Sequence, residues 1–232
     1  MVVKVLAGVL LTAVIILGFG LPMSAHPEAW YELPTIPGLE EKARIIFFHV
    51  PTAWLSVLAF LTSMWFAIQY LRTRDRLSDQ KSSAAAGLGF MFCVLATLTG
   101  AVWAKFNWGS FWNWDPRETS IFVLLLIYGA YFSLRSAVEV EEKRATLASV
   151  YAIIAAVTAP FFIFVMPRIM TGLHPGAKGD PEGAGPVVEM KMSPTMRVIF
   201  FTSLIGFTLL FIWMFTLRVR TARLEADNQL KG

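Results

Sequence analysis

Cysteine and charged residues are scarce in this sequence. Among 232 residues there is one cysteine, Cys93, and it lies inside a long apolar run. A single cysteine excludes an internal disulfide and every C-x-x-C or C-x-x-C-H motif. The chain is therefore neither a thiol oxidoreductase nor itself a c-type cytochrome.

Charged residues make up only 16% of the chain, whereas hydrophobic residues make up 56%, and the mean hydropathy is +0.60. This composition is too apolar for a soluble domain of this length and indicates a membrane protein with several spans. The net charge of +4 does not indicate nucleic-acid binding, because the basic residues lie in short loops and form no patch. We expect no nucleic-acid partner.

Six apolar runs are long enough to cross a bilayer, for which an α-helix needs about 20 residues. They lie at about residues 5–21, 45–71, 83–104, 120–134, 145–166 and 198–217. The fourth run should begin nearer Pro116, because Asp115 and Glu118 have the spacing of a capping box, with proline at the first helical position. The predicted fold is all-α: residues 1–232 form one integral-membrane domain with six transmembrane helices.

The first run also has features of a signal peptide. Lys4 precedes it, and Ser24 and Ala25 follow it as a possible small-residue cleavage site. Its apolar core is long for a signal peptide, so we expect a retained membrane anchor.

Lysine and arginine predict the orientation, because they concentrate in cytoplasmic loops. Basic residues crowd the second and fourth loops and follow the last span: Arg72, Arg74, Arg76, Lys81, Arg135, Lys143, Arg144, Arg218, Arg220 and Arg223. Both termini should therefore be cytoplasmic, with the first, third and fifth loops on the outer face. The fifth loop, about residues 167–196, is rich in glycine and proline, a composition typical of a mobile linker or lid.

A dense aromatic cluster lies in the third loop. Residues 108–119 read Trp-Gly-Ser-Phe-Trp-Asn-Trp-Asp-Pro-Arg-Glu-Thr, with three tryptophans and a phenylalanine within seven residues. Indole rings are rigid, flat and common where apolar and aqueous surroundings meet. The cluster is either a platform for a large planar ligand or an aromatic belt at the membrane surface.

All three histidines are predicted on the same side as this cluster: His26 and His174 in outer loops, and His49 at the outer mouth of the second span. Imidazole is a good axial ligand of haem iron, and aromatic faces cover a porphyrin. Two histidines from different outer segments beside an aromatic platform can therefore form a bis-histidine haem site. His26 lies in an ordinary polar loop, and we do not expect it to be a ligand.

Prolines define the setting of the other two histidines. Pro51 disfavours helical geometry at the preceding residue, so His49 should lie at a helix start or kink. Pro175 and the flanking glycines place His174 on a turn. Haem propionates need cationic partners, and four candidates lie on the predicted outer face: Lys105, Arg117, Arg168 and Lys178.

The pattern Trp108-Gly109-x-x-Trp112-x-Trp114-Asp115 resembles the tryptophan-rich "WWD" signature of the haem-handling proteins of cytochrome c biogenesis. Within that superfamily the chain is most similar to the cytochrome c maturation protein C (CcmC) family. The similarity rests on length, six spans, His-Val-Pro at residues 49–51 and Leu-His-Pro at residues 173–175. It runs from about residue 45 to the end of the sixth span.

This resemblance implies a protein that binds haem b at the periplasmic face of a bacterial cytoplasmic membrane, with His49 and His174 as axial iron ligands. It implies contacts with the haem or its acceptor from the tryptophan loop, about residues 105–119: Trp108, Gly109, Phe111, Trp112, Trp114, Asp115 and Arg117. Asp115 would orient this loop.

The resemblance also implies partners. The protein would present haem to a periplasmic haem chaperone (CcmE-like). Its other partners would be ABC transporter subunits (CcmA/CcmB-like), a small single-span subunit (CcmD-like) and membrane lipid. Such a protein is a transfer module and not an enzyme.

One feature points to an alternative. Residues 115–119 read Asp-Pro-Arg-Glu-Thr, close to the Asp-Pro-Lys-Glu-Thr of the larger cytochrome c synthases of the same superfamily. Those synthases carry a further histidine pair within the membrane, which this chain lacks, so we interpret it as a receiver and presenter at the outer face. The alternative is a haem-attaching subunit of a synthase, acting with a partner that carries redox cysteines. A pore or solute carrier fits poorly with spans that hold almost no ionisable residues.

Overall fold

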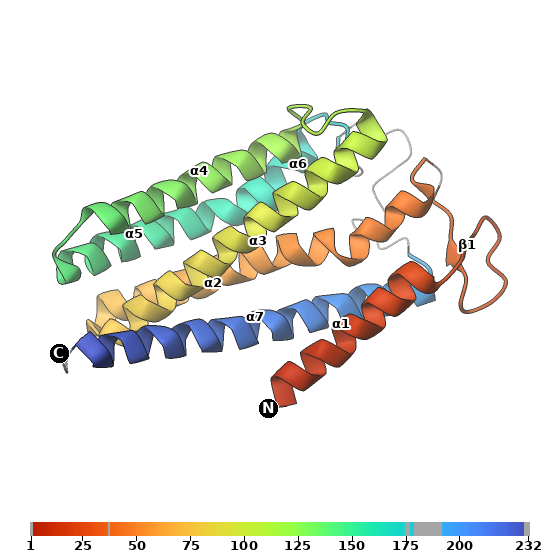
Figure 1. The fold of residues 1–232 in the computed structure, drawn as a ribbon. Helices are drawn as coiled ribbons and strands as arrows, with labels where there is room; N and C mark the ends of the chain where they lie inside the picture. The colour runs from red at the N-terminus through yellow and green to blue at the C-terminus, as the bar shows by residue number, and fades with distance from the viewer. Residues whose placement is uncertain (1, 37, 175–176, 179–191, 230–232) are drawn as a thin grey trace.

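The computed structural model describes residues 2–36, 38–174, 177–178 and 192–229. Within these residues six helical segments are long and apolar enough to cross a membrane (Figure 1). Their main helices are α1 (Val2–Gly20), α2 (His49–Thr73), α3 (Arg76–Trp108), α4 (Pro116–Ala137), α5 (Glu141–Pro160) and α7 (Pro194–Gln229). The prediction of an all-α polytopic membrane protein with six spans is confirmed.

Short elements join or extend these helices. The strands β1 (Met23–Ser24) and β2 (Leu33–Pro34) pair in parallel between α1 and α2. A 3-10 helix, η1 (Glu40–Phe47), leads into α2. The fifth span continues beyond α5 through a π-helical turn, η2 (Phe161–Val165), into α6 (Met166–Ile169). Apolar runs alone did not predict these changes of helix type.

Most helices also extend past their apolar runs, because residues with good helix propensity continue them into polar surroundings. The largest difference is in α7, which reaches Gln229 instead of residue 217. The expected early start of the fourth span is confirmed, since α4 begins at Pro116.

The connections alternate between the two ends of the bundle. The α2–α3 and α4–α5 connections lie at the end where the C-terminal end of α7 is found, and the α3–α4 connection lies at the opposite end with β1 and α6 (Figure 1). We call this opposite end the tryptophan end, after residues 108–114. Segments far apart in the sequence meet there.

Small side chains allow the helices to approach closely. The buried face of α5 consists of alanines and one serine: Ala145, Ala148, Ser149, Ala152, Ala155, Ala156 and Ala159. On α3, a Cβ added to Gly89 would lie 2.5 Å from the ring of Phe60, and Phe60 in turn stacks on Tyr128 with ring centroids 3.6 Å apart. Close backbone approach through small residues is a common way of packing helices in membranes.

A partly buried ion pair joins α3 to α4 towards the end opposite the tryptophan end. The guanidinium of Arg135 donates two hydrogen bonds to the carboxylate of Asp79, at 2.6 and 2.9 Å. A bidentate pair of this kind fixes geometry as well as charge. Together with the alanine face of α5, it makes the bundle a fixed support for the tryptophan end.

Candidate functional site

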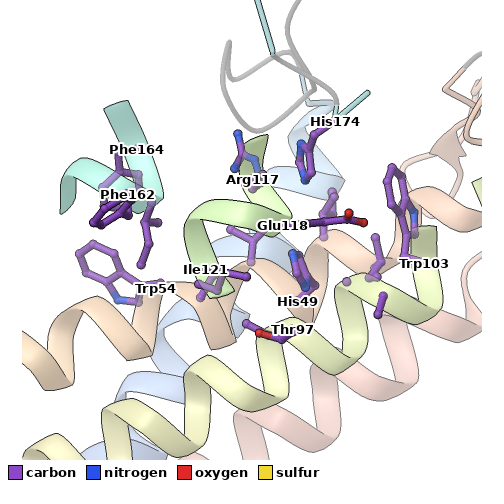
Figure 2. A pocket seen from close by; sticks show the side chains of 18 of the residues that line it. His49, Trp54, Thr97, Trp103, Arg117, Glu118, Ile121, Phe162, Phe164 and His174 are labelled. Carbon is purple, nitrogen blue, oxygen red and sulfur yellow. The ribbon is translucent and has the colours of Figure 1, made fainter. Parts of the chain in front are cut away.

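A cavity of about 420 Å³ lies at the tryptophan end, bordered by residues of η1, α2, α3, α4, η2 and α7. Cofactor and small-molecule sites typically enclose about 300–1,000 Å³. Most of its lining is apolar or aromatic. The charged and imidazole side chains that line it are His49, Arg117, Glu118, Arg168 and His174 (Figure 2).

His49 is the first residue of α2, so its predicted position at a helix start is confirmed. Pro51 falls in the first turn, where a missing backbone N–H costs little. The imidazole packs against α3: a Cβ added to Gly100 would lie 3.0 Å from its Cε1. The ring therefore has little room to move away from the cavity.

A hydrogen bond joins this ring to α3. His49 Nδ1 lies 3.0 Å from the hydroxyl oxygen of Thr99, and that hydroxyl lies 2.8 Å from the carbonyl oxygen of Leu95, to which it donates. Thr99 can accept from Nδ1–H of His49 in the tautomer that carries its proton on Nδ1. The Nε2 atom then keeps its lone pair and can bind a metal.

His174 lies on the chain segment that follows α6. The amide of Ala177 donates to the His174 carbonyl at 3.0 Å, whereas Pro175, on which the predicted turn rests, lies outside the described residues. The imidazole lies beside two indoles, with ring centroids 6.0 Å from Trp103 and 6.4 Å from Trp108. Part of the fifth loop that was predicted to be a linker or lid, residues 175–176 and 179–191, lies outside the described residues.

The structure brings these two histidines together. Figure 2 shows them facing the same cavity from opposite sides, His49 from α2 and His174 from the chain beyond α6. Trp103 stands on one flank of the pair, and Trp54, Phe162 and Phe164 lie on the other. His26, which we did not expect to be a ligand, is exposed and lies outside the cavity lining.

The tryptophan loop divides into two groups. Trp108 and Trp112 line the cavity. Phe111 and Trp114 are 56% and 71% exposed and lie outside the lining. Trp112 contacts Trp114 edge-on, with centroids 5.9 Å apart. The loop therefore presents one aromatic surface to the cavity and another to the surroundings of the protein.

Gly109 has a local structural role, and Trp103 is a lining residue that the sequence did not single out. Gly109 ends α3 with a φ of 81°, a left-handed conformation that glycine adopts without steric cost, and it does not line the cavity. Trp103 does line it, and its indole N–H donates to the carbonyl of Lys42 at 3.2 Å. Trp103 lies inside the third apolar run, where sequence gives no reason to separate it from a lipid-facing tryptophan.

Asp115 and Glu118 form the predicted capping box at the start of α4. Asp115 Oδ1 accepts from the amide of Arg117 at 2.9 Å, and Glu118 Oε2 accepts from the amides of Asn113 and Asp115 at 2.7 and 3.3 Å. Asp115 does more than was predicted. Its Oδ2 also accepts from the amides of Leu173 and His174, at 2.6 and 3.4 Å.

Of the four cations predicted to bind carboxylates, two line the cavity: Arg117 and Arg168. Lys105 instead donates to the Gly109 carbonyl at 2.8 Å, and Lys178 lies outside the lining. Arg117 Nε is buried and has no hydrogen-bond partner among the described residues. A buried, unpaired guanidinium nitrogen is unusual, and an anionic group in the cavity would satisfy it.

Comparison with known proteins identifies the family. The family model CcmC, described as heme exporter protein C, matches residues 2–231. Heme exporter protein C of Paracoccus denitrificans is 32% identical over 178 residues, which cover 77% of this chain and 72% of the relative. The Bradyrhizobium diazoefficiens protein of the same name is 32% identical over 210 residues, 90% and 75% of the two chains. The Escherichia coli K12 protein is 28% identical over 194 residues, 80% and 72%. The chain belongs to the CcmC family of heme exporter proteins.

Proposed function

We propose that this protein binds haem b in the cavity at the tryptophan end, with the iron between His49 and His174, and presents it for cytochrome c maturation. The observation that carries the proposal is the convergence of two imidazoles on one apolar, tryptophan-lined cavity. The names of the relatives, heme exporter protein C, support haem as the cargo. The same names support a transfer protein and not an enzyme.

The two imidazoles supply what a haem iron needs from a protein. A proton on Nδ1 of His49, shared with Thr99, would leave Nε2 as the donor atom, the arrangement usual for metal-bound histidine. His174 enters from the opposite side of the cavity (Figure 2). Axial ligation by two histidines would hold the iron without a covalent bond to the porphyrin, so the cargo can be passed on.

The remaining lining fits the rest of the molecule. Trp103, Trp108 and Trp112 offer flat apolar faces to a porphyrin. Arg117 and Arg168 would pair with the propionates, because guanidinium binds carboxylate through two parallel hydrogen bonds. The unpaired Nε of Arg117 supports this assignment.

We propose that the tryptophan end faces the periplasm. The basic loops lie at the opposite end, with Arg74 and Arg76 beside the α2–α3 connection and Lys143 and Arg144 beside the α4–α5 connection. Positive loops remain cytoplasmic, so a cytoplasmic membrane location places both termini inside. The exposed rings of Phe111 and Trp114 would then meet a periplasmic haem chaperone of the CcmE type. The other proposed partners are CcmA/CcmB-like transporter subunits and a CcmD-like single-span subunit.

Replacing either proposed ligand tests the central assignment. We expect the haem-loaded parent to show a six-coordinate low-spin absorption spectrum. His49→Ala and His174→Ala should each lose the low-spin species, because one nitrogen ligand is removed, and added imidazole should restore it. His26→Ala is the matched control and should keep the parental spectrum. An unchanged Soret band in both cavity variants would remove these histidines as ligands.

Thr99→Val tests whether the hydrogen bond to α3 matters for the His49 ligand. Removing a hydrogen-bond partner of a metal-bound histidine typically weakens binding about 10- to 100-fold, and we expect a loss of that size in haem titrations of the purified protein. Thr97→Val is the control. The Thr97 hydroxyl donates to the carbonyl of Cys93 and makes no hydrogen bond to His49 within the described residues, although Thr97 also lines the cavity. Equal haem affinity in the two variants would contradict the proposed role of Thr99.

The cavity-lining and the exposed tryptophans of this loop should have different functions. Trp112→Ala should lower the ratio of haem to purified protein, because Trp112 lines the cavity. Trp114→Ala should keep that ratio and reduce the covalent loading of haem onto a CcmE-type chaperone, because Trp114 is exposed. If both variants match the parent in both assays, the tryptophans are interface anchors only.

A further inference from the structure

The carboxylate of Asp115 connects the tryptophan loop to the segment that carries His174. Its two oxygens have different partners. Oδ1 accepts from the Arg117 amide and caps α4, whereas Oδ2 accepts from the amides of Leu173 and His174 at 2.6 and 3.4 Å. One side chain thus caps the start of α4 and also anchors the segment of residues 173–174, which is remote in sequence.

We infer that Asp115 is a positioning residue for His174, holding its backbone so that the imidazole reaches the cavity. This inference rests on the proposed function, because it gives His174 its role as a ligand. Asp115 is not among the residues that line the cavity. It acts through the amide of the ligand residue and the amide before it.

Burial shields the anchor from solvent. Asp115 is only 5% exposed, and hydrogen bonds from N–H groups to an ionised carboxylate are shorter and stronger than those to a neutral acceptor. The start of α4 adds a partial positive charge that favours the carboxylate at this position. The anchoring bonds are therefore little weakened by competing solvent.

Gly172 shows that the close approach is built into the sequence. A Cβ added to Gly172 would lie 2.6 Å from Asp115 Oδ2 and 3.0 Å from Cδ of Pro116. Both atoms belong to the rigid start of α4, so a larger residue at 172 would have to displace the His174 segment. Glycine is required at position 172 because a side chain would collide with Asp115 and Pro116, and not because of an unusual backbone φ.

The two proposed ligands are thus held by different means. The ring of His49 is fixed directly, by Thr99 and the surface of Gly100. His174 is fixed through its backbone amide by Asp115, and its ring lies beside the indoles of Trp103 and Trp108, with ring centroids 6.0 and 6.4 Å away. Loss of the Asp115 anchor should consequently affect one side of the iron only.

Two substitutions remove the anchor by independent routes. Asp115→Ser keeps a capping box, since serine followed three residues later by Glu118 is the usual form of that motif, but its single oxygen on a shorter side chain cannot serve both sets of amides. Gly172→Ala leaves the cap of α4 intact and forces the two segments apart. Matched controls are Asp75→Ser, at the equivalent cap of α3, and Gly129→Ala, whose added Cβ would meet no atom within 4 Å.

The readouts are the low-spin fraction of bound ferric haem and the haem affinity. We expect Asp115→Ser and Gly172→Ala each to lose low-spin haem and to regain it with added imidazole. Each should also bind haem about 10- to 100-fold more weakly, the usual loss when a group that orients a metal ligand is removed. The two controls should match the parent. A parental spectrum and affinity in Gly172→Ala would overturn the inference, because that variant retains the cap.

A double substitution separates positioning from general stability. If Asp115 acts through His174, Asp115→Ser combined with His174→Ala should show the same haem affinity as His174→Ala alone, whereas independent effects would multiply. Multiplying effects would overturn the inference. If His174→Ala itself leaves the spectrum unchanged, the proposed function fails instead, so the two failures are distinguishable.

Discussion

Two imidazoles from separate parts of a chain can share one iron only if the backbone beneath each is fixed. In the proposed haem site this requirement falls on helix ends. His49 is the first residue of α2, and His174 follows the short helix α6 and is tied to the first turn of α4. The rest of the structure can be understood as the support that keeps these ends at one cavity.

The support is a tightly packed bundle of small residues. The alanine face of α5 and the contact between Gly89 and Phe60 bring the helices close, and the Asp79–Arg135 pair locks α3 to α4. Such packing leaves few alternative arrangements. The proposed ligands, His49 and His174, would inherit that rigidity, which is how proteins hold metal-binding geometry.

Sequence predicted the features that are encoded locally. Apolar runs predicted six spans, and the residues Asp115, Pro116 and Glu118 predicted the start of α4, because both signals depend on neighbours within one or two turns. Pro51 predicted the helix start at His49. The change from 3-10 to α-helix before that residue was not predicted, since apolar runs do not distinguish helix types.

The features that sequence did not predict depend on contacts between remote segments. Nothing near Trp103 distinguishes it from a tryptophan at the membrane surface, and only the packing of α3 turns it towards the cavity. The exposure of Trp114 and the second role of Asp115 are likewise set by the position of the loop against α4 and by residues 172–174. The spacing of residues in the tryptophan loop predicts that the loop forms a site. It does not predict which of these residues face the cavity and which face outward.

The most direct test is an experimental density map of the haem-loaded protein. The account predicts iron bonded to Nε2 of both His49 and His174, with the porphyrin against Trp112 and its propionates towards Arg117. Iron bound through any other pair of residues, or a porphyrin lying outside the cavity at the tryptophan end, would contradict it.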